Sequence, residues 1–352
     1  MHQFDIKQRA QKPVAIWLMV IVVMLIAMIV VGGLTRLTDS GLSITEWKPI
    51  TGIVPPLSAE AWQSEFEKYQ QIPEYKLQNK SMSIDEFKGI YWWEWGHRVL
   101  GRTIGFVVLL PMIFFWLRGM LCTGLKLRLS LLFVLGGFQG YLGWWMVHSG
   151  LGGLGDVLDV SPYRLVVHLG MALLILGITL WTWMDIRLSE HRRHWHTQSN
   201  LTRLAWALLA LVFVQLLLGG FVAGNDGGYI ANTWPLINGG LVPASFGDLQ
   251  PFWRNWFEDP LIAQFNHRIG AYLVLIVTIV YLWQVFKQNK IELRLLGLLV
   301  AAVISLQVLL GIWTLIAVSP IPLAVAHQFL ALIAFLSVLG AVHASSRYYR
   351  SS

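Results

Sequence analysis

One short segment in the first third of the chain combines residues that can do chemistry with strongly apolar surroundings. The segment YWWEWGHRVLGRTIG at 91–105 contains Glu94, His97, Arg98 and Arg102, and it runs directly into FVVLLPMIFFWL. A carboxylate can carry a proton or stabilise positive charge, an imidazole can ligate a metal, and a guanidinium can bind a carboxylate. The spacing therefore predicts a polar site at the mouth of an apolar helix.

The same pattern recurs in the second half of the chain. GHRVLGRTIG at 96–105 is matched by NHRIGAYLVL at 266–275, and SPYRLVVH at 161–168 is matched by SPIPLAVAH at 319–327. Four histidines fall on this repeat: His97 and His168 in the first half, His267 and His327 in the second. Two pairs on a duplicated scaffold favour a functional role over four separate packing residues.

Paired histidines of this kind favour a bis-histidine haem in each half. Such a haem needs two axial nitrogen ligands and an apolar slot for the macrocycle, and a helical bundle supplies both. Zinc fits less well, because two distant pairs leave each metal ion short of ligands. Arg98, Arg102 and Arg268 follow the histidines closely; they are candidates for binding haem propionates, or else they anchor the helices at the membrane interface.

An acid accompanies the histidine in only one of the two halves. Aligned at the His-Arg pair, the first half reads Glu94-Trp-Gly-His97 and the second reads Gln264-Phe-Asn-His267. A neutral amide can position a group but cannot carry a proton or stabilise a developing cation, so the first site is predicted to react and the second to hold a cofactor. The alternative is that Glu94 forms an ordinary ion pair with a nearby arginine.

The elements that must position these residues are membrane-spanning helices. The 352-residue chain is 56% hydrophobic and 13% charged, and its mean hydropathy of +0.59 is too apolar for a soluble domain of this size. Because each half contributes four spans, the repeat is parallel. We predict an all-α integral membrane protein built as two four-helix bundles, with halves at 1–190 and 191–352. Eight apolar runs are long enough to cross a bilayer, near 14–34, 98–117, 128–148, 164–184, 204–223, 268–286, 294–317 and 322–343.

The positive charges indicate how these spans are oriented. Lys and Arg are concentrated at both termini and in the loops after the second, fourth and sixth spans, which the positive-inside rule places in the cytoplasm. The net charge of +7 is therefore mainly topological, and no nucleic-acid surface is expected. The histidine sites then lie toward the outer side of a bacterial inner (plasma) membrane. The large outer loop 35–96 is predicted to be partly helical, with a capping box at Ser83–Glu86 opening a helix that continues into the second span.

In combination these segments resemble the heme A synthase family. The resemblance rests on EWGHR at 94–98, NHR at 266–268, SPYRLVVH, AHQ and GGLTRLTDSGLSITEWKPITGIVPP, and it covers about residues 14 to 345. It implies oxidation of the C8 methyl group of heme O to the formyl group of heme A, the prosthetic group of aa3-type terminal oxidases, by successive hydroxylations. It also implies that His97 and His168 ligate the substrate heme O, that His267 and His327 ligate a resident heme b, and that Glu94 is the catalytic acid.

The resemblance also implies a set of partners. These are a heme O synthase as substrate supplier, an unidentified electron donor or acceptor, and the cytochrome oxidase assembly machinery; homo-oligomerisation is left open. Some family members carry a cysteine pair in an outer loop that is proposed to relay electrons. Here the single Cys122 lies in a predicted cytoplasmic loop, so the chain is similar to the cysteine-less subclass.

Two other functions fit part of the pattern. A bis-histidine electron-transfer cytochrome usually needs haems near both membrane faces, whereas all four histidines here lie on the predicted outer side. A haem or small-molecule transporter needs a pathway to the cytoplasm, and the inner halves of the spans show no line of ionisable residues. Neither function explains why Glu94 has no acidic counterpart in the second half.

The remaining histidines and one matched pair of glutamines are expected to have other roles. His148 is predicted to be an interfacial residue, and His2 and His343 have no recognisable partner. Gln139 and Gln307 match across the repeat, which predicts interhelical hydrogen bonds. A solvated or lipid-headgroup face is expected for His191, His194 and His196.

Overall fold

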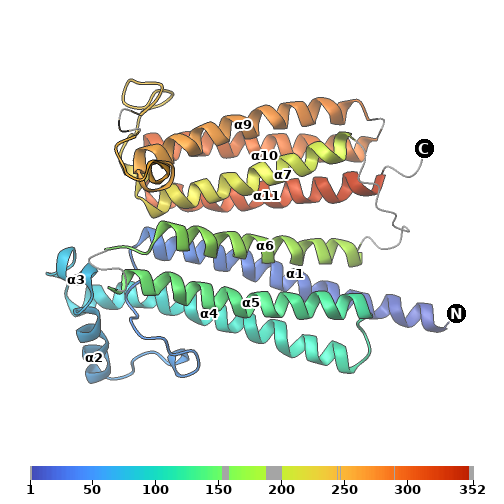
Figure 1. Cartoon of the computed structure of the whole chain (residues 1–352). Coiled ribbons are helices and arrows are strands. Elements are labelled where there is room, and N and C mark those ends of the chain that lie inside the picture. The colour runs from blue at the N-terminus through green and yellow to red at the C-terminus, as the bar shows by residue number, and fades with distance from the viewer. Residues whose placement is uncertain are drawn as a thin grey trace. The chain divides into compact units, whose positions relative to one another are not determined.

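The chain folds as a set of long helices that confirm the predicted all-α membrane architecture. The computed structural model describes residues 2–152, 158–187, 200–243, 245, 247–288 and 290–348, and the side chains of those between 12 and 346. Within this part of the chain, eight helices are long and apolar enough to span a membrane (Figure 1). They are α1 (His2–Leu37), α4 (Ile84–Leu117), α5 (Thr123–Gly150), α6 (Pro162–Arg187), α7 (Asn200–Gly224), α9 (Pro260–Phe286), α10 (Ile291–Ile316) and α11 (Ile321–Tyr348).

The roles predicted for His191, His194 and His196, and for the side chain of His2, fall outside the described residues.

The loops after α1 and α7 contain short helices. The loop after α1 contains η1 (Thr51–Ile53), α2 (Ala59–Tyr69) and α3 (Pro73–Leu77), which confirms the prediction that this loop is partly helical. The loop after α7 contains η2 (Gly227–Tyr229), η3 (Phe252–Arg254) and α8 (Asn255–Glu258).

Helix α4 begins well before the apolar run that it contains. Ser83 is its N-cap: the Ser83 hydroxyl accepts from the Glu86 backbone N–H, and the Glu86 carboxylate accepts from the Ser83 N–H at 2.7 Å. This capping box confirms the predicted continuity. At 34 residues α4 is about 51 Å long, well beyond a hydrocarbon core of about 30 Å. One helix therefore carries both Glu94 and His97 on neighbouring turns.

Contacts divide the chain into two compact units. One contains residues 20–175, and the other contains residues 1–19 together with 176–352. In the second unit α7 packs on α9, α9 on α10, α10 on α11, and α11 on α7, which closes a four-helix bundle. The division at 190 and 191 into substrate and cofactor halves stays a prediction.

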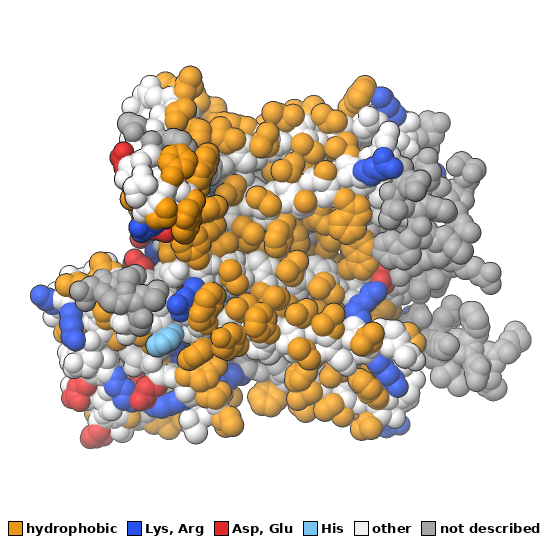
Figure 2. Space-filling model, viewed as in Figure 1, with side chains coloured by type: hydrophobic (Ala, Val, Ile, Leu, Met, Phe, Trp, Pro, Cys, Tyr) orange, Lys and Arg blue, Asp and Glu red, His pale blue; other side chains and the backbone are white. Residues whose placement is uncertain are grey.

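The side-chain distribution is that of a lipid-facing protein. Hydrophobic side chains cover the flanks of the long helices, and Lys and Arg side chains lie toward the helix ends (Figure 2). Large apolar residues within the spans are exposed, for example Leu110 at 61% and Leu306 at 55%. A hydrocarbon environment stabilises such surfaces, whereas water would not.

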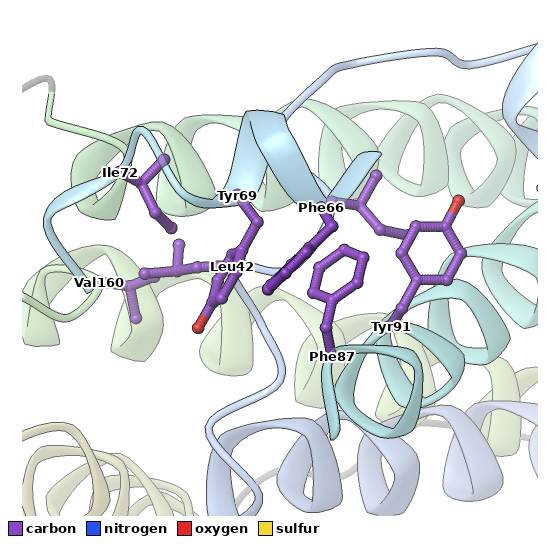
Figure 3. Packing of buried hydrophobic residues seen from close by; sticks show 8 residues of the cluster. Leu42, Phe66, Tyr69, Ile72, Phe87, Tyr91 and Val160 are labelled. Carbon is purple, nitrogen blue, oxygen red and sulfur yellow. The ribbon is translucent and has the colours of Figure 1, made fainter. Parts of the chain in front are cut away.

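The loop after α1 has a hydrophobic core of its own. Phe66 and Tyr69 of α2 pack against Phe87 and Tyr91 at the start of α4, with ring centroids 5.1 Å apart for Phe66 and Phe87 (Figure 3). Three further segments complete this cluster with Leu42, Ile44, Ile72 and Val160. The aromatic packing holds the loop as a folded cap over the first turns of α4.

A buried acid lies beside this core. The Glu74 side chain of α3 is only 3% exposed, and its carboxylate accepts a 2.6 Å hydrogen bond from the Tyr69 hydroxyl. Burial, with the nearby charges of Asp39, Asp159 and Glu94, raises the pKa of Glu74 from 4.5 to about 7. Protonation of Glu74 therefore stabilises the folded loop.

Replacing Glu74 with glutamine is expected to flatten the pH dependence of stability. Because the folded pKa lies above the unfolded one, stability is highest below about pH 4.5 and is lost as the pH rises through about 7. The loss at pH 8 is at most about 3 kcal/mol. Thermal melting of the detergent-solubilised protein at pH 5 and pH 8 measures it, and Glu74→Gln should raise the melting temperature at pH 8. The exposed control Glu67→Gln should retain the wild-type dependence; an unchanged slope in Glu74→Gln contradicts the assignment.

One histidine has a partner that the sequence did not reveal. The expectation that His343 stands alone is wrong: its Nε2 lies 3.0 Å from Oδ1 of Asp185, and both side chains are buried. Trp181 packs edge-on against the His343 ring, with centroids 4.9 Å apart. The pair joins α6 to α11 within one unit, although 158 positions of sequence separate its members.

Candidate functional site

The four repeat histidines occupy matching places on four helices. His97 lies on α4, His168 on α6, His267 on α9 and His327 on α11, and each side chain is only partly buried. Each ring lies against a glycine of a neighbouring helix, where an added Cβ atom would crowd it. A Cβ atom on Gly311 would lie 2.7 Å from Cε1 of His327. The other three pairs are Gly32 with His97, Gly143 with His168, and Gly219 with His267, at 3.0 to 3.2 Å.

The second-half pair has the separation that shared metal ligation requires. The ring centroids of His267 and His327 are 6.4 Å apart, and the ring planes are inclined by 78°. Metal–imidazole bonds are about 2.0 Å long, so two imidazoles on opposite sides of one ion have centroids about 6 Å apart. The His267–His327 pair therefore fits one iron atom between two axial ligands.

Glutamines hold three of these histidines in place. The amide nitrogen of Gln139 donates to the backbone carbonyl of His168 at 3.0 Å, and that of Gln307 donates to the carbonyl of His327 at 3.0 Å. These bonds confirm the interhelical role predicted for the matched glutamines. A third, Gln215 on α7, donates to the His267 carbonyl at 2.8 Å. Sequence reasoning missed Gln215, although its spacing to Gly219 equals that of Gln139 to Gly143.

Unsatisfied polar atoms surround the rings. The side-chain oxygens of Gln139, Gln215 and Gln307 are buried and accept no hydrogen bond, and the same is true of Nδ1 of His168. Buried polar atoms without partners are rare in finished protein interiors. Together with the glycine cradles and the ring separation, they show that the residues present fit a flat, metal-centred group.

Glu94 is buried in a dense set of donors. Its Oε1 accepts from Nε and Nη2 of Arg98, at 3.0 and 2.6 Å. Its Oε2 accepts from the Ser43 hydroxyl and from the Ile44 backbone N–H, each at 2.7 Å. The ion pair that the sequence offered as the alternative to a reactive acid is therefore present: Glu94 pairs with Arg98, one helical turn from His97, and it also ties the loop after α1 to α4. A catalytic role for Glu94 stays a prediction.

The second half contains a version of this arrangement in which an amide replaces the carboxylate. Arg268 donates to the Gln264 side-chain oxygen at 2.7 Å, and the Gln264 amide donates to the Gly227 carbonyl at 2.7 Å. Arg268 also donates to the Ala231 carbonyl at 3.0 Å. Each half thus uses one residue pair, spaced i and i+4, to hold its outer loop, but only the first pair contains a carboxylate.

The three candidate propionate arginines differ in the donors that they have left. Every side-chain nitrogen of Arg98 already donates, to Glu94 and to the carbonyls of Ile44 and Glu46. Arg102 binds the Lys48 and Pro49 carbonyls, but its Nη1 is buried without a partner. Nε of Arg268 is likewise buried and unpartnered. Two of the three therefore retain an N–H that an anionic group can take.

The other metal-binding residue types are dispersed. Among the described residues, no three His, Cys, Asp or Glu side chains come together as a metal site. His148 is exposed and stacks on Trp144 with centroids 5.7 Å apart, and Cys122 is an exposed free cysteine. Neither side chain joins the histidine sites.

Comparison with known proteins gives one consistent result. The sequence profile COX15-CtaA, described as "Cytochrome oxidase assembly protein", matches residues 15–339. A protein of Maricaulis maris named "Heme A synthase" is 48% identical over 336 residues, which cover 96% of this chain and 97% of that protein. Proteins with the same name are 48% identical in Parvibaculum lavamentivorans (94% and 93% covered) and 44% identical in Paracoccus denitrificans (97% and 90% covered).

Proposed function

This chain belongs to the COX15-CtaA family of cytochrome oxidase assembly proteins, and we propose that it acts as a heme A synthase. In this reaction the C8 methyl group of heme O is hydroxylated twice, each step taking an oxygen atom from water and passing two electrons to an external acceptor, and the resulting gem-diol loses water to become the formyl group of heme A. The observation that carries the proposal is the pair of matching histidine sites, of which one alone has a buried carboxylate on the same helix as its histidine.

The two sites are assigned by that difference. His97 and His168 would ligate the substrate heme O, beside Glu94. His267 and His327, which have the separation of two axial ligands, would hold a resident heme b. When bound, heme b supplies one-electron redox chemistry. In that half Gln264 and Arg268 position the outer loop without a carboxylate.

Glu94 would act as a fixed negative charge. An ionised carboxylate accepts hydrogen bonds only, and four donors converge on its two oxygens. This arrangement holds the charge in place before the reaction, so no reorganisation is needed when positive charge builds at the methyl carbon. The hydrogen bonds also leave Glu94 poorly placed to shuttle a proton, which favours charge stabilisation over general-base catalysis.

The unpartnered N–H groups suggest where haem propionates would lie. Nη1 of Arg102 in the first half and Nε of Arg268 in the second are free to bind a carboxylate. Arg98 would contribute indirectly, because it keeps Glu94 and the loop at Ile44–Glu46 in position. These assignments place the propionates toward the end of each bundle where α4 and α9 begin.

The chain is a multi-pass membrane protein, and its orientation and partners belong to the same proposal. Both termini would lie in the cytoplasm and both haem sites toward the periplasmic side of the inner membrane, as the positive-inside rule indicates. A heme O synthase would supply the substrate. Electron exchange requires a partner other than a cysteine pair, since Cys122 is the only cysteine.

Identification of the bound haems tests this function directly. The full chain is expressed with a heme O synthase, purified, and its haems are extracted and identified by mass. Heme A and its hydroxylated precursors are expected, together with heme b. If heme b alone is found, the chain is an electron-transfer cytochrome, and the synthase proposal fails.

A further inference from the structure

The contacts of three repeat histidines follow one rule. On α5, α7 and α10, a glutamine precedes by four residues the glycine that cradles the ring: Gln139 and Gly143, Gln215 and Gly219, Gln307 and Gly311. Residues at i and i+4 share one face of a helix, so the glutamine and the glycine approach the same histidine. Each glutamine donates to the backbone carbonyl of that histidine, at 2.8 to 3.0 Å.

The fourth histidine breaks the rule. On α1 the residue four positions before Gly32 is Met28, where α7 has Gln215 before Gly219. Met28 faces the helix that carries His97, since its Cε lies 3.3 Å from the position of a Cβ on Gly101 of α4, four residues after His97; Gln215 likewise contacts Gly270 of α9, three residues after His267. A thioether donates no hydrogen bond. Among the described side chains, none hydrogen-bonds to His97.

The His97 ring also lies differently. Gly143, Gly219 and Gly311 face the Cε1 atom of their histidines, whereas Gly32 faces Nε2 of His97 at 3.2 Å. Each of the three histidines with a glutamine partner thus turns its Cε1 atom toward the glycine. His97, which has no glutamine partner, turns its Nε2 atom toward Gly32 instead. Groups that hydrogen-bond to a metal ligand hold its orientation, and their loss weakens metal affinity by about 10- to 100-fold.

We propose that Met28 makes His97 the releasable ligand of the chain, so that one haem can be exchanged while the other is retained. The inference rests on the proposed function, in which the first site must accept a new substrate and release a product in every cycle, whereas the second site keeps its cofactor. Because Met28 stands where a fourth glutamine would be, the most weakly held histidine, His97, belongs to the site that must exchange its haem. Met28 is on this account a positioning residue, which acts through His97.

Haem release from the purified full chain tests the inference. Wild type and variants, prepared with a heme O synthase, are mixed with excess apomyoglobin, and the haem that leaves is identified by chromatography over time. Heme O and heme A are expected to leave wild type faster than heme b. Met28→Gln should slow their loss by about three- to tenfold, the effect of one added hydrogen bond, and should leave heme b unchanged. The reciprocal Gln215→Met should speed heme b loss by a similar factor.

Controls separate the possible outcomes. Met28→Leu changes the side chain without adding a donor and should release heme O at the wild-type rate. If Met28→Gln retains both haems and their wild-type release rates, the inference is wrong while the proposed function stands. If Met28→Gln fails to fold, Gln215→Met decides, and an unchanged rate of heme b loss overturns the inference. Wild type without heme O or heme A overturns both proposals.

Discussion

Glu94→Gln is expected to stop heme A formation while both haem sites remain filled. The substitution removes the negative charge beside the substrate site but keeps an oxygen that Arg98 can bind. Loss of a preorganised catalytic charge typically lowers the rate about 100- to 1,000-fold. Mass analysis of extracted haems measures the effect, and heme O should accumulate as heme A disappears.

The second half of the chain indicates why this variant should fold. There Gln264 and Arg268 already hold an outer loop with the geometry that Glu94 and Arg98 use in the first half. The Ile44 N–H loses an acceptor when the new amide nitrogen faces it, which costs about 1–3 kcal/mol. Glu94→Ala is a poorer test, because it also removes the side-chain oxygen that a glutamine would still offer to the partly buried Arg98.

A matched control distinguishes charge from loop position. Ser43→Ala removes one hydrogen bond to Glu94 without changing its charge. If the negative charge matters, Ser43→Ala keeps most of the heme A output. Equal losses in Ser43→Ala and Glu94→Gln would show that attachment of the loop is the important property, and wild-type output from Glu94→Gln would remove Glu94 from the chemistry altogether.

His267→Ala is expected to remove heme b and, with it, heme A production. In the proposed assignment His267 and His327, whose ring centroids are 6.4 Å apart, would together hold heme b, so the loss of either would remove one of its two histidine ligands. Bound heme b should fall at least about tenfold, since even outer-shell partners of metal ligands have effects of this size. The haem-to-protein ratio measured by pyridine haemochrome spectra provides the readout.

Two other histidine variants serve as controls for His267→Ala. His148→Ala changes an exposed histidine away from the repeat pairs and should leave both haems bound. His97→Ala should reduce heme O content and leave heme b in place. Retention of heme b in His267→Ala together with its loss in His97→Ala would reverse the assignment of the two halves.

Much of the site was predictable because its signals are local or repeated. The spacing of Ser83 and Glu86 predicts the start of α4, and helix geometry then places Glu94 and His97 on neighbouring turns. Gln264 lies three residues before His267, where the first half has Glu94 three residues before His97, so the sequence alone also showed that only one half carries the acid. Gln215 was open to the same reasoning, because Gln-x-x-x-Gly occurs three times in the chain's odd-numbered spans.

Other features depend on segments that meet only in the folded protein. The partners of Glu94 at Ser43 and Ile44 lie about 50 positions away in sequence, and no local pattern announces them. The same holds for His343 and Asp185. Glu74 reads as an ordinary loop acid, and its raised pKa comes mainly from its burial in the folded loop, with a further contribution from the charges of Asp39, Asp159 and Glu94.

By itself, the sequence determined the membrane class, the eight spans, the duplicated histidine pairs and the single acid, because hydrophobic length, helical period and internal repetition are properties of the chain order. The tertiary structure alone decided which groups satisfy one another: the four donors on Glu94, the glutamines at three histidines, and the methionine at the fourth. Hydrogen bonds between helices depend on the rotation and depth of each helix in its bundle, and those are set by packing across the whole unit.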